Sequence, residues 1–260
     1  MARMSLFMIV SALMSGAVVG ALLGLFGGGG SVLATPLLLY VVGVSDPHVA
    51  IGTSAAAVAV NAGLNLVGHG RGGRVKWPCA SVFAGAGLIG SFLGSTLAKA
   101  VDGQRLLLGF AVAMAAIALS MMRRPKSQGD PLVHISPGLM LRLAPLGVLT
   151  GLAAGFFGVG GGFLIVPGLM AATGMTLANA TASSLLSVSL FGAATSLNYA
   201  ASGLINWPVA GLFVLGGLAG GALGVRGAGL LAGRALLARR LFAGLVLLVA
   251  AYVAFKATTA

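Results

Sequence analysis

The sequence carries very little charge, and hardly any of it is negative. Only 7% of its 260 residues are Asp, Glu, Lys or Arg, whereas a soluble globular domain carries about 25%. So few charged side chains cannot cover a water-facing surface. With a hydrophobic fraction of 58% and a mean hydropathy of +1.08, the chain is predicted to be an integral membrane protein surrounded by the lipid bilayer.

Groups that build metal centres and active sites are also scarce. The single cysteine, Cys79, excludes an internal disulfide and a multi-cysteine metal site. The acidic and histidine residues all fall in predicted loops: Asp46, Asp102, Asp130, His48, His69 and His134. No predicted span therefore holds a carboxylate for cation pumping or a cluster of metal ligands. No nucleophile–base pair is visible either, so we expect no enzyme and no cofactor.

The basic residues outnumber the acidic ones, and the formal net charge is +12. Such a charge also suits a protein that binds nucleic acid. In an apolar chain, however, Lys and Arg gather in the cytoplasmic loops, where they set the orientation of the spans. We therefore expect no nucleic-acid partner.

A glycine-rich stretch occurs twice in the chain. Residues 16–43 read GAVVGALLGLFGGGGSVLATPLLLYVVG, and residues 147–174 read GVLTGLAAGFFGVGGGFLIVPGLMAATG. Eleven of the 28 aligned positions are identical. Because each glycine costs a helix interior about 1 kcal/mol relative to alanine, both copies predict a helix that breaks at its glycine cluster. The chain is thus predicted to be an internal duplication.

The predicted fold is an all-α polytopic membrane protein made of two homologous repeats. Residues 1–122 form the N-terminal transmembrane repeat, residues 123–138 a polar cytoplasmic linker, and residues 139–260 the C-terminal transmembrane repeat. Each repeat has one Gly-broken helix and three spanning helices of about 20 residues. This makes eight spans if each broken helix counts once, or ten segments if each break is a hairpin. The N-terminal apolar stretch resembles a signal peptide, but it lacks a clear cleavage site and is predicted to be retained.

The loop charges favour inverted repeats over parallel ones. The loop at residues 68–76 has three basic residues, whereas its counterpart at 202–206 has none. Conversely, Asp102 nearly balances the charge of the loop at 99–105, while the counterpart at 225–240 has four arginines. Equivalent loops with opposite bias lie on opposite sides of the membrane. Both termini are then expected on the side away from the basic loops.

Other glycines recur at four-residue spacing, as in Gly16-Gly20-Gly24 and Gly90-Gly94. Small residues at this spacing allow helix backbones to approach closely in lipid. We therefore expect these two series to be helix-packing contacts.

The two glycine breaks are the predicted binding site, and they suit a small anion. Unwound backbone in a membrane is tolerated only where it is buried in protein or lines a wet cavity. A helix that restarts after a break presents free N–H groups and a positive dipole end. A simple kink or tight turn is the alternative. The candidate residues are Gly29, Gly30, Ser31 and Pro36 in the first copy, and Gly160, Gly161, Gly162 and Pro167 in the second.

Hydroxyl and amide side chains follow each break on the next helix. A Thr-Ser pair in the first copy corresponds to a Ser-Ser pair in the second, and Asn65 lies one turn after Asn61. Neutral donors on one helix face suit an oxyanion, and they equally suit hydrogen bonds between helices. Both interpretations stay open for the hydroxyl residues, and packing is favoured for the asparagines. The candidate set is Thr53, Ser54, Asn61, Ser183 and Ser184.

The pattern GxxGxGG(S/G)xxxxP occurs in both copies, and a Thr/Ser-Ser pair follows each proline by 16 to 18 residues. In this respect the chain resembles the TauE/SafE sulfite exporter family, also called the toluenesulfonate uptake permease family, over residues 10–255. The resemblance implies a multi-pass permease of the bacterial inner membrane for small sulfur-containing anions such as sulfite, sulfonates or thiosulfate. It also implies secondary transport driven by the proton-motive force. The second copy departs from the first in having Ala182 where the first has Gly52.

We therefore expect a transporter that works by alternating access around the two breaks. A passive anion channel and a non-transporting membrane scaffold are the alternatives. The sequence leaves the solute, the direction of transport, the coupling ion and the oligomeric state open.

Overall fold

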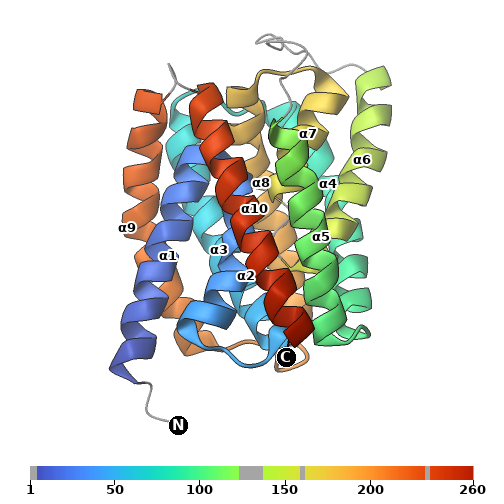
Figure 1. Cartoon of the computed structure of the whole chain (residues 1–260). Coiled ribbons are helices and arrows are strands. Elements are labelled where there is room, and N and C mark those ends of the chain that lie inside the picture. The colour runs from blue at the N-terminus through green and yellow to red at the C-terminus, as the bar shows by residue number, and fades with distance from the viewer. Residues whose placement is uncertain (1–4, 123–136, 159–161, 232–234, 260) are drawn as a thin grey trace.

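The computed structural model of the protein describes residues 5–122, 137–158, 162–231 and 235–259 (Figure 1). Most of these residues are helical, and no β-strand occurs among them, as predicted for an all-α protein. Eight helical stretches among them are long and apolar enough to cross a membrane. The first half comprises α1 (Leu6–Phe26), η1 (Gly27–Leu33), α2 (Ala34–Leu37), η2 (Leu38–Val42), α3 (Pro47–Arg71), α4 (Trp77–Lys99) and α5 (Gly103–Met122). The second comprises α6 (Pro137–Phe157), α7 (Gly162–Thr173), α8 (Leu177–Ala200), α9 (Trp207–Leu231) and α10 (Ala235–Thr259).

Polar residues and prolines set where several helices begin. The carboxylate of Asp46 accepts hydrogen bonds from the first N–H groups of α3, and Thr176 does the same for α8. Pro78 lies in the first turn of α4, where a missing N–H costs nothing. The helix limits thus follow from ordinary capping chemistry.

The chain reverses direction at each glycine break. Gly27 ends α1 with a φ of 61°, and the backbone of Gly30 then packs against the backbone of Leu22 and Leu23. As a result η2 lies back against α1, and α7 lies back against α6 in the second half. Each broken helix is therefore a hairpin of one long and one shorter arm.

Glycines with positive φ mark the same turns in both halves. Six of them occur among the described residues, and they form pairs separated by 130 or 131 positions in the chain. The members are Gly27 with Gly158, Gly43 with Gly174, and Gly73 with Gly203. Such a φ favours glycine, so the duplicated sequence repeats the turns at which the backbone needs it.

The two halves interlock and do not stand side by side. Helix α1 packs on α9, α4 on α6, α3 on α8 and α5 on α10, so the main helix pairs join opposite halves (Figure 1). The glycine series provide these contacts: a methyl group on Gly16 would collide with the backbone of Phe213, and one on Gly147 with that of Phe83. The predicted packing role of the four-residue glycine spacing is confirmed.

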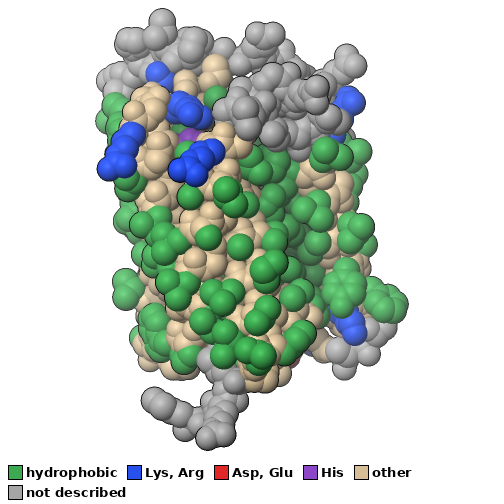
Figure 2. Space-filling model, turned by 90° about the vertical axis from the view of Figure 1, so that its left-hand side faces the viewer, with side chains coloured by type: hydrophobic (Ala, Val, Ile, Leu, Met, Phe, Trp, Pro, Cys, Tyr) green, Lys and Arg blue, Asp and Glu red, His purple; other side chains and the backbone are tan. Residues whose placement is uncertain are grey.

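The two ends of the bundle differ in charge. Both termini lie at the lower end of Figure 1, while α5 ends and α6 begins at the upper end. Figure 2 shows most of the visible Lys and Arg side chains at the upper end, a further basic side chain near the lower end, and a largely apolar wall between them. The wall suits contact with lipid. These directions agree with inverted repeats, an arrangement that stays a prediction.

Candidate functional site

The two glycine breaks meet inside the protein. A methyl group on Gly28 of η1 would collide with Gly162 at the start of α7, and one on Gly162 would collide with the Gly28 backbone. All residues of η1, including the candidates Gly29, Gly30 and Ser31, are buried. The interruptions therefore share one buried place where the two halves touch. The candidates Gly160 and Gly161 lie outside the described residues.

A serine from each half reaches the break of the other half. The Gly28 N–H donates a hydrogen bond to Ser184 Oγ of α8 at 3.1 Å. At the other break, Ser54 Oγ of α3 lies 3.4 Å from the carbonyl oxygen of Gly158. Both serine side chains are fully buried. The duplicated Thr/Ser-Ser motif thus brings a hydroxyl group to each break.

Two further hydroxyl groups line the first break. Ser31 Oγ donates to the carbonyl of Gly28 at 2.8 Å, and Thr35 Oγ1 is 2.9 Å from Ser54 Oγ. Thr35 was absent from the sequence-based candidates. Its position one turn after Ser31, directly before the buried Pro36, is the signal that could have found it. The equivalent Pro167 is exposed on α7, so the two prolines differ in surroundings.

The other members of the hydroxyl pairs point elsewhere. Thr53 Oγ1 accepts a hydrogen bond from the backbone N–H of Asn206, which precedes α9, at 2.9 Å. Ser183 Oγ accepts one from Lys76, which precedes α4, also at 2.9 Å. Neighbouring residues of a helix point about 100° apart, so one member of each pair faces the break and the other a helix start. Thr53 and Ser183 hold the two halves together.

Asn61 lies on α3 with its amide against Gly217 of α9. Its side chain is buried, and neither amide atom has a hydrogen-bond partner among the described residues. Its backbone carbonyl accepts a hydrogen bond from Asn65 Nδ2 at 2.9 Å. Asn61 is thus a buried polar group whose side chain is unsatisfied.

The prediction that His69 lies in a loop is wrong. His69 belongs to the last turn of α3, is 3% exposed, and its Nε2 is 3.0 Å from the carbonyl oxygen of Gly24. The buried polar side chains of α3 lower its hydropathy, and this hid the final turn of the helix from a reading based on apolar runs. His48, too, lies in a helix, in the first turn of α3.

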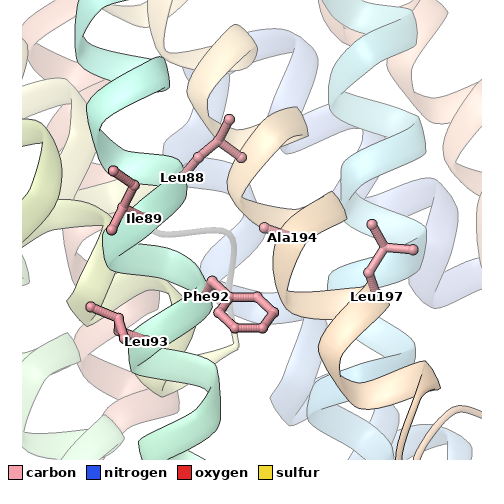
Figure 3. A pocket seen from close by; sticks show the side chains of 6 residues that line it. All are labelled: Leu88, Ile89, Phe92, Leu93, Ala194 and Leu197. Carbon is pink, nitrogen blue, oxygen red and sulfur yellow. The ribbon is translucent and has the colours of Figure 1, made fainter.

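The remaining features add little chemistry. The described residues contain no group of three His, Cys, Asp or Glu that could hold a metal ion. Figure 3 shows a groove on the outer wall between α4 and α8, lined only by apolar side chains. Its lining residues are Leu88, Ile89, Phe92, Leu93, Ala194 and Leu197. An apolar groove facing outward suits a lipid chain better than an anion.

Comparison with known proteins shows which family the chain belongs to. The family described as sulfite exporter TauE/SafE matches residues 12–253. The chain belongs to this family. The resemblance seen in the doubled glycine motif is therefore confirmed, and the TauE/SafE protein is a multi-pass membrane protein, located in bacteria in the plasma membrane.

Relatives of this TauE/SafE protein are named as transporters. A "probable membrane transporter protein" of Xylella fastidiosa is 50% identical over 246 residues, covering 93% of each chain. The "probable membrane transporter protein YunE" of Bacillus subtilis is 26% identical over 243 residues, covering 84% of this chain and 86% of the relative. No solved structure matches the chain. The family and these names support a membrane transporter.

Proposed function

We propose that this TauE/SafE protein is a secondary carrier of small sulfur-containing anions such as sulfite, sulfonates or thiosulfate. The observation that supports this most is the buried contact between two broken helices at Gly28 and Gly162. Main-chain N–H groups and the N-terminus of α7 attract an anion there without a cationic side chain. A hydrogen bond to an anion is charge-assisted and roughly twice as strong as a neutral one, so these main-chain donors bind an anion without a lysine or arginine in the site.

In this proposal the main-chain amides of the breaks bind the anion, and the serine hydroxyls complete its shell. The amides belong to Gly29, Gly30, Gly160, Gly161 and Gly162. Ser54 and Ser184 would supply the hydroxyls, because they already contact the break of the opposite half. Ser184 Oγ accepts from the Gly28 N–H and donates to the Thr181 carbonyl in this structure, so its hydrogen would turn to the anion. Ser31 and Thr35 support the first break from inside.

Alternating access would then arise from two bundles that rock about the breaks. The closest helix pairs, α1 with α9 and α4 with α6, each combine one helix from either half. We therefore infer that the moving bodies are these mixed pairs and not the repeats themselves. If the halves are inverted repeats, the site would open to one side of the membrane in one extreme state and to the opposite side in the other. Secondary transport coupled to protons belongs to the same proposal.

Flux in proteoliposomes tests the carrier. Purified protein is expected to move radiolabelled sulfite, a sulfonate or thiosulfate, and the unlabelled solute on the far side should accelerate the flux. A channel would show flux without this trans-stimulation, and a scaffold would show no flux of any of the three solutes. Either result would overturn the proposal.

The serines give a sharper test of the site. Ser54→Ala and Ser184→Ala each remove a hydroxyl that contacts the opposite break, so both should lower the flux while the protein stays in the membrane. Ser120→Ala on α5 is the matched control, because this exposed serine donates only to the carbonyl of Ile117 in its own helix. Equal flux in all three variants would exclude the serines from the site.

A further inference from the structure

A polar stripe runs along one face of α3 inside the membrane-spanning bundle. Asn61, Asn65 and His69 follow one another at four-residue spacing, so their side chains lie on one face of the helix. They are 1%, 5% and 3% exposed. Buried polar groups are unfavourable unless they are hydrogen-bonded, and this applies with more force in lipid. Three buried polar side chains in a row on a membrane-spanning helix therefore need a structural or functional explanation.

Three atoms of the stripe have no partner among the described residues: Nδ2 and Oδ1 of Asn61 and Nδ1 of His69. The neighbours explain why. Asn61 faces Gly217 and Asn65 faces Gly221, both on α9, while His69 meets the Gly24 carbonyl on α1. Glycine has no side chain with which to pair. We call this junction of α1, α3 and α9 the polar seam, defined by Asn61, Asn65 and His69.

The second half closes the equivalent junction differently. The duplication places Phe191, Thr195 and Tyr199 of α8 at the positions of the three seam residues. The ring of Phe191 fills the space over Gly87, and Thr195 Oγ1 is paired with Ser91 Oγ at 3.0 Å. Packing of this junction thus does not require an unpaired amide. A hydroxyl without a partner remains at Tyr199, but the unpaired amide is particular to the first half, so this amide points to a ligand and not to the architecture.

The seam leads towards the basic upper end. Arg74 lies close enough to His69 for an electrostatic interaction, and Lys76 follows in the same loop. Helix α1 contributes no titratable side chain, and α9 contributes the exposed Arg226, next to the Val225 that contacts Gly68. Figure 2 shows a histidine among the Lys and Arg side chains of this end. The described groups around the imidazole are therefore basic, and an anion is the partner that a protonated ring would need.

The hydrogen bond of His69 identifies the atom that titrates. The ring nitrogen beside a carbonyl oxygen carries the hydrogen, so Nε2 donates to Gly24 and Nδ1 is the free acceptor. Protonation of Nδ1 creates a buried cation beside Arg74, which is unfavourable alone and favourable next to an anion. An anion at this place and a proton on Nδ1 therefore stabilise each other.

We propose that the transported anion passes between the glycine breaks and the upper end along the polar seam, bound in turn by the amide of Asn61 and by the imidazolium of His69. The two stations are eight residues apart, or about 12 Å along the helix, so a small anion occupies one at a time. One proton enters with the anion at His69 and leaves with it. This inference rests on the proposed function, and it names the route and the titrating group.

Thiol labelling tests the route whichever anion the protein carries. In a Cys79→Ala background, which removes the only native thiol, Asn61→Cys and His69→Cys should react with an anionic methanethiosulfonate added at the upper side of oriented vesicles. A cationic reagent of similar size should react more slowly. Phe191→Cys, at the equivalent place in the second half, is the control and should stay unmodified. Failure of both seam cysteines to react would overturn the route, even if the protein proves to be a carrier.

Two substitutions then test the chemistry in proteoliposomes. Asn61→Leu replaces an unsatisfied amide by an apolar group of similar shape, which leaves folding stability unchanged or higher. Its flux is expected to fall about tenfold or more, equivalent to the loss of about 1.4 kcal/mol of binding. Unchanged flux would contradict a role for the amide.

His69→Gln keeps a polar side chain and removes the titration. Wild-type flux should rise as the upper-side pH is lowered, because the protonated imidazole is the form that binds the anion. In the variant this dependence should disappear, whereas Tyr199→Phe, which removes an unpartnered hydroxyl at the equivalent position, should retain it. The same pH profile in His69→Gln and the wild type would overturn the assignment of the proton site. Absence of any flux in the wild type would instead count against the proposed function.

Discussion

The Nζ of Lys99 and the Oδ1 of Asn198 lie 2.8 Å apart and tie the lower end of α4 to that of α8. Lys99 also donates to Ser202 Oγ at 2.8 Å, and the Asn198 amide donates to Ser95 Oγ at 2.7 Å. The duplication places Gly68 and Val225 at the positions of Asn198 and Ser95, and these two make only an apolar contact. The lower end is therefore held by a polar network that the described residues do not form at these equivalent positions of the upper end.

Lys99→Met should loosen this lower closure. Hydrogen bonds to a charged group contribute about 1.5–3 kcal/mol each when buried, and the partial exposure of Lys99 reduces this to about 1 kcal/mol in total. We expect a lower melting temperature in detergent and faster labelling, from the lower side, of a cysteine at residue 187, a buried position of α8 whose side chain makes no hydrogen bond in this network. Arg142→Met, at an exposed position of α6, is the control. Identical labelling with and without Lys99 would show that the network is no closure.

Neighbouring glycines of the first break should respond oppositely to a methyl group. Gly28→Ala collides with Gly162 and should prevent the hairpins from meeting, with loss of folded protein. Gly29→Ala meets its nearest atom, in the Phe242 ring, at 3.6 Å, which is an ordinary contact. It should fold and yet lower anion flux, because the methyl group crowds a binding amide. Size-exclusion profiles and flux check the pair, and normal flux in Gly29→Ala would remove that amide from the site.

Within each hydroxyl pair, substitution of one residue should change mainly the stability of the fold, and substitution of the other mainly the transport rate. Thr53→Val and Ser183→Ala lose a hydrogen bond to a helix start in the other half and should cost about 1 kcal/mol of stability each. Their flux per folded molecule should match that of the wild type. Melting curves and flux measured side by side check this. A flux loss as large as that of Ser54→Ala would place these two residues in the site after all.

Glycines between α1 and α9 should tolerate no side chain. Gly20→Leu drives a branched group into the backbone of Gly217 and should abolish a monodisperse preparation. Gly244→Leu on α10, where nothing lies within 4 Å of an added Cβ, should behave like the wild type. Fluorescence-detected chromatography of tagged variants compares the two. Recovery of folded Gly20→Leu protein would argue against this helix contact.

The sequence was sufficient for those parts of the structure that local chemistry determines. Repeated glycines and the low charge were enough to predict the all-α membrane fold and both helix breaks. The sequence could not predict which hydroxyl of each pair faces the glycine break. Thr53 and Ser54 are neighbours on α3, and their side chains differ only in their direction around the helix axis. The contacts of His69 and of the Lys99–Asn198 pair could not be predicted from local sequence, since their partners are 45 and 99 residues away in the chain.

The cross-half pairing of α1 with α9 has a consequence for biogenesis. The last residue of α1 is Phe26, and α9 begins only at Trp207, so the glycine face of the first helix has no lasting neighbour while most of the chain is being made. At a synthesis rate of about 5–20 residues per second, this delay is of the order of ten seconds or more. A nascent membrane protein of this kind needs lipid or an insertion factor to shield that face until the late helix arrives.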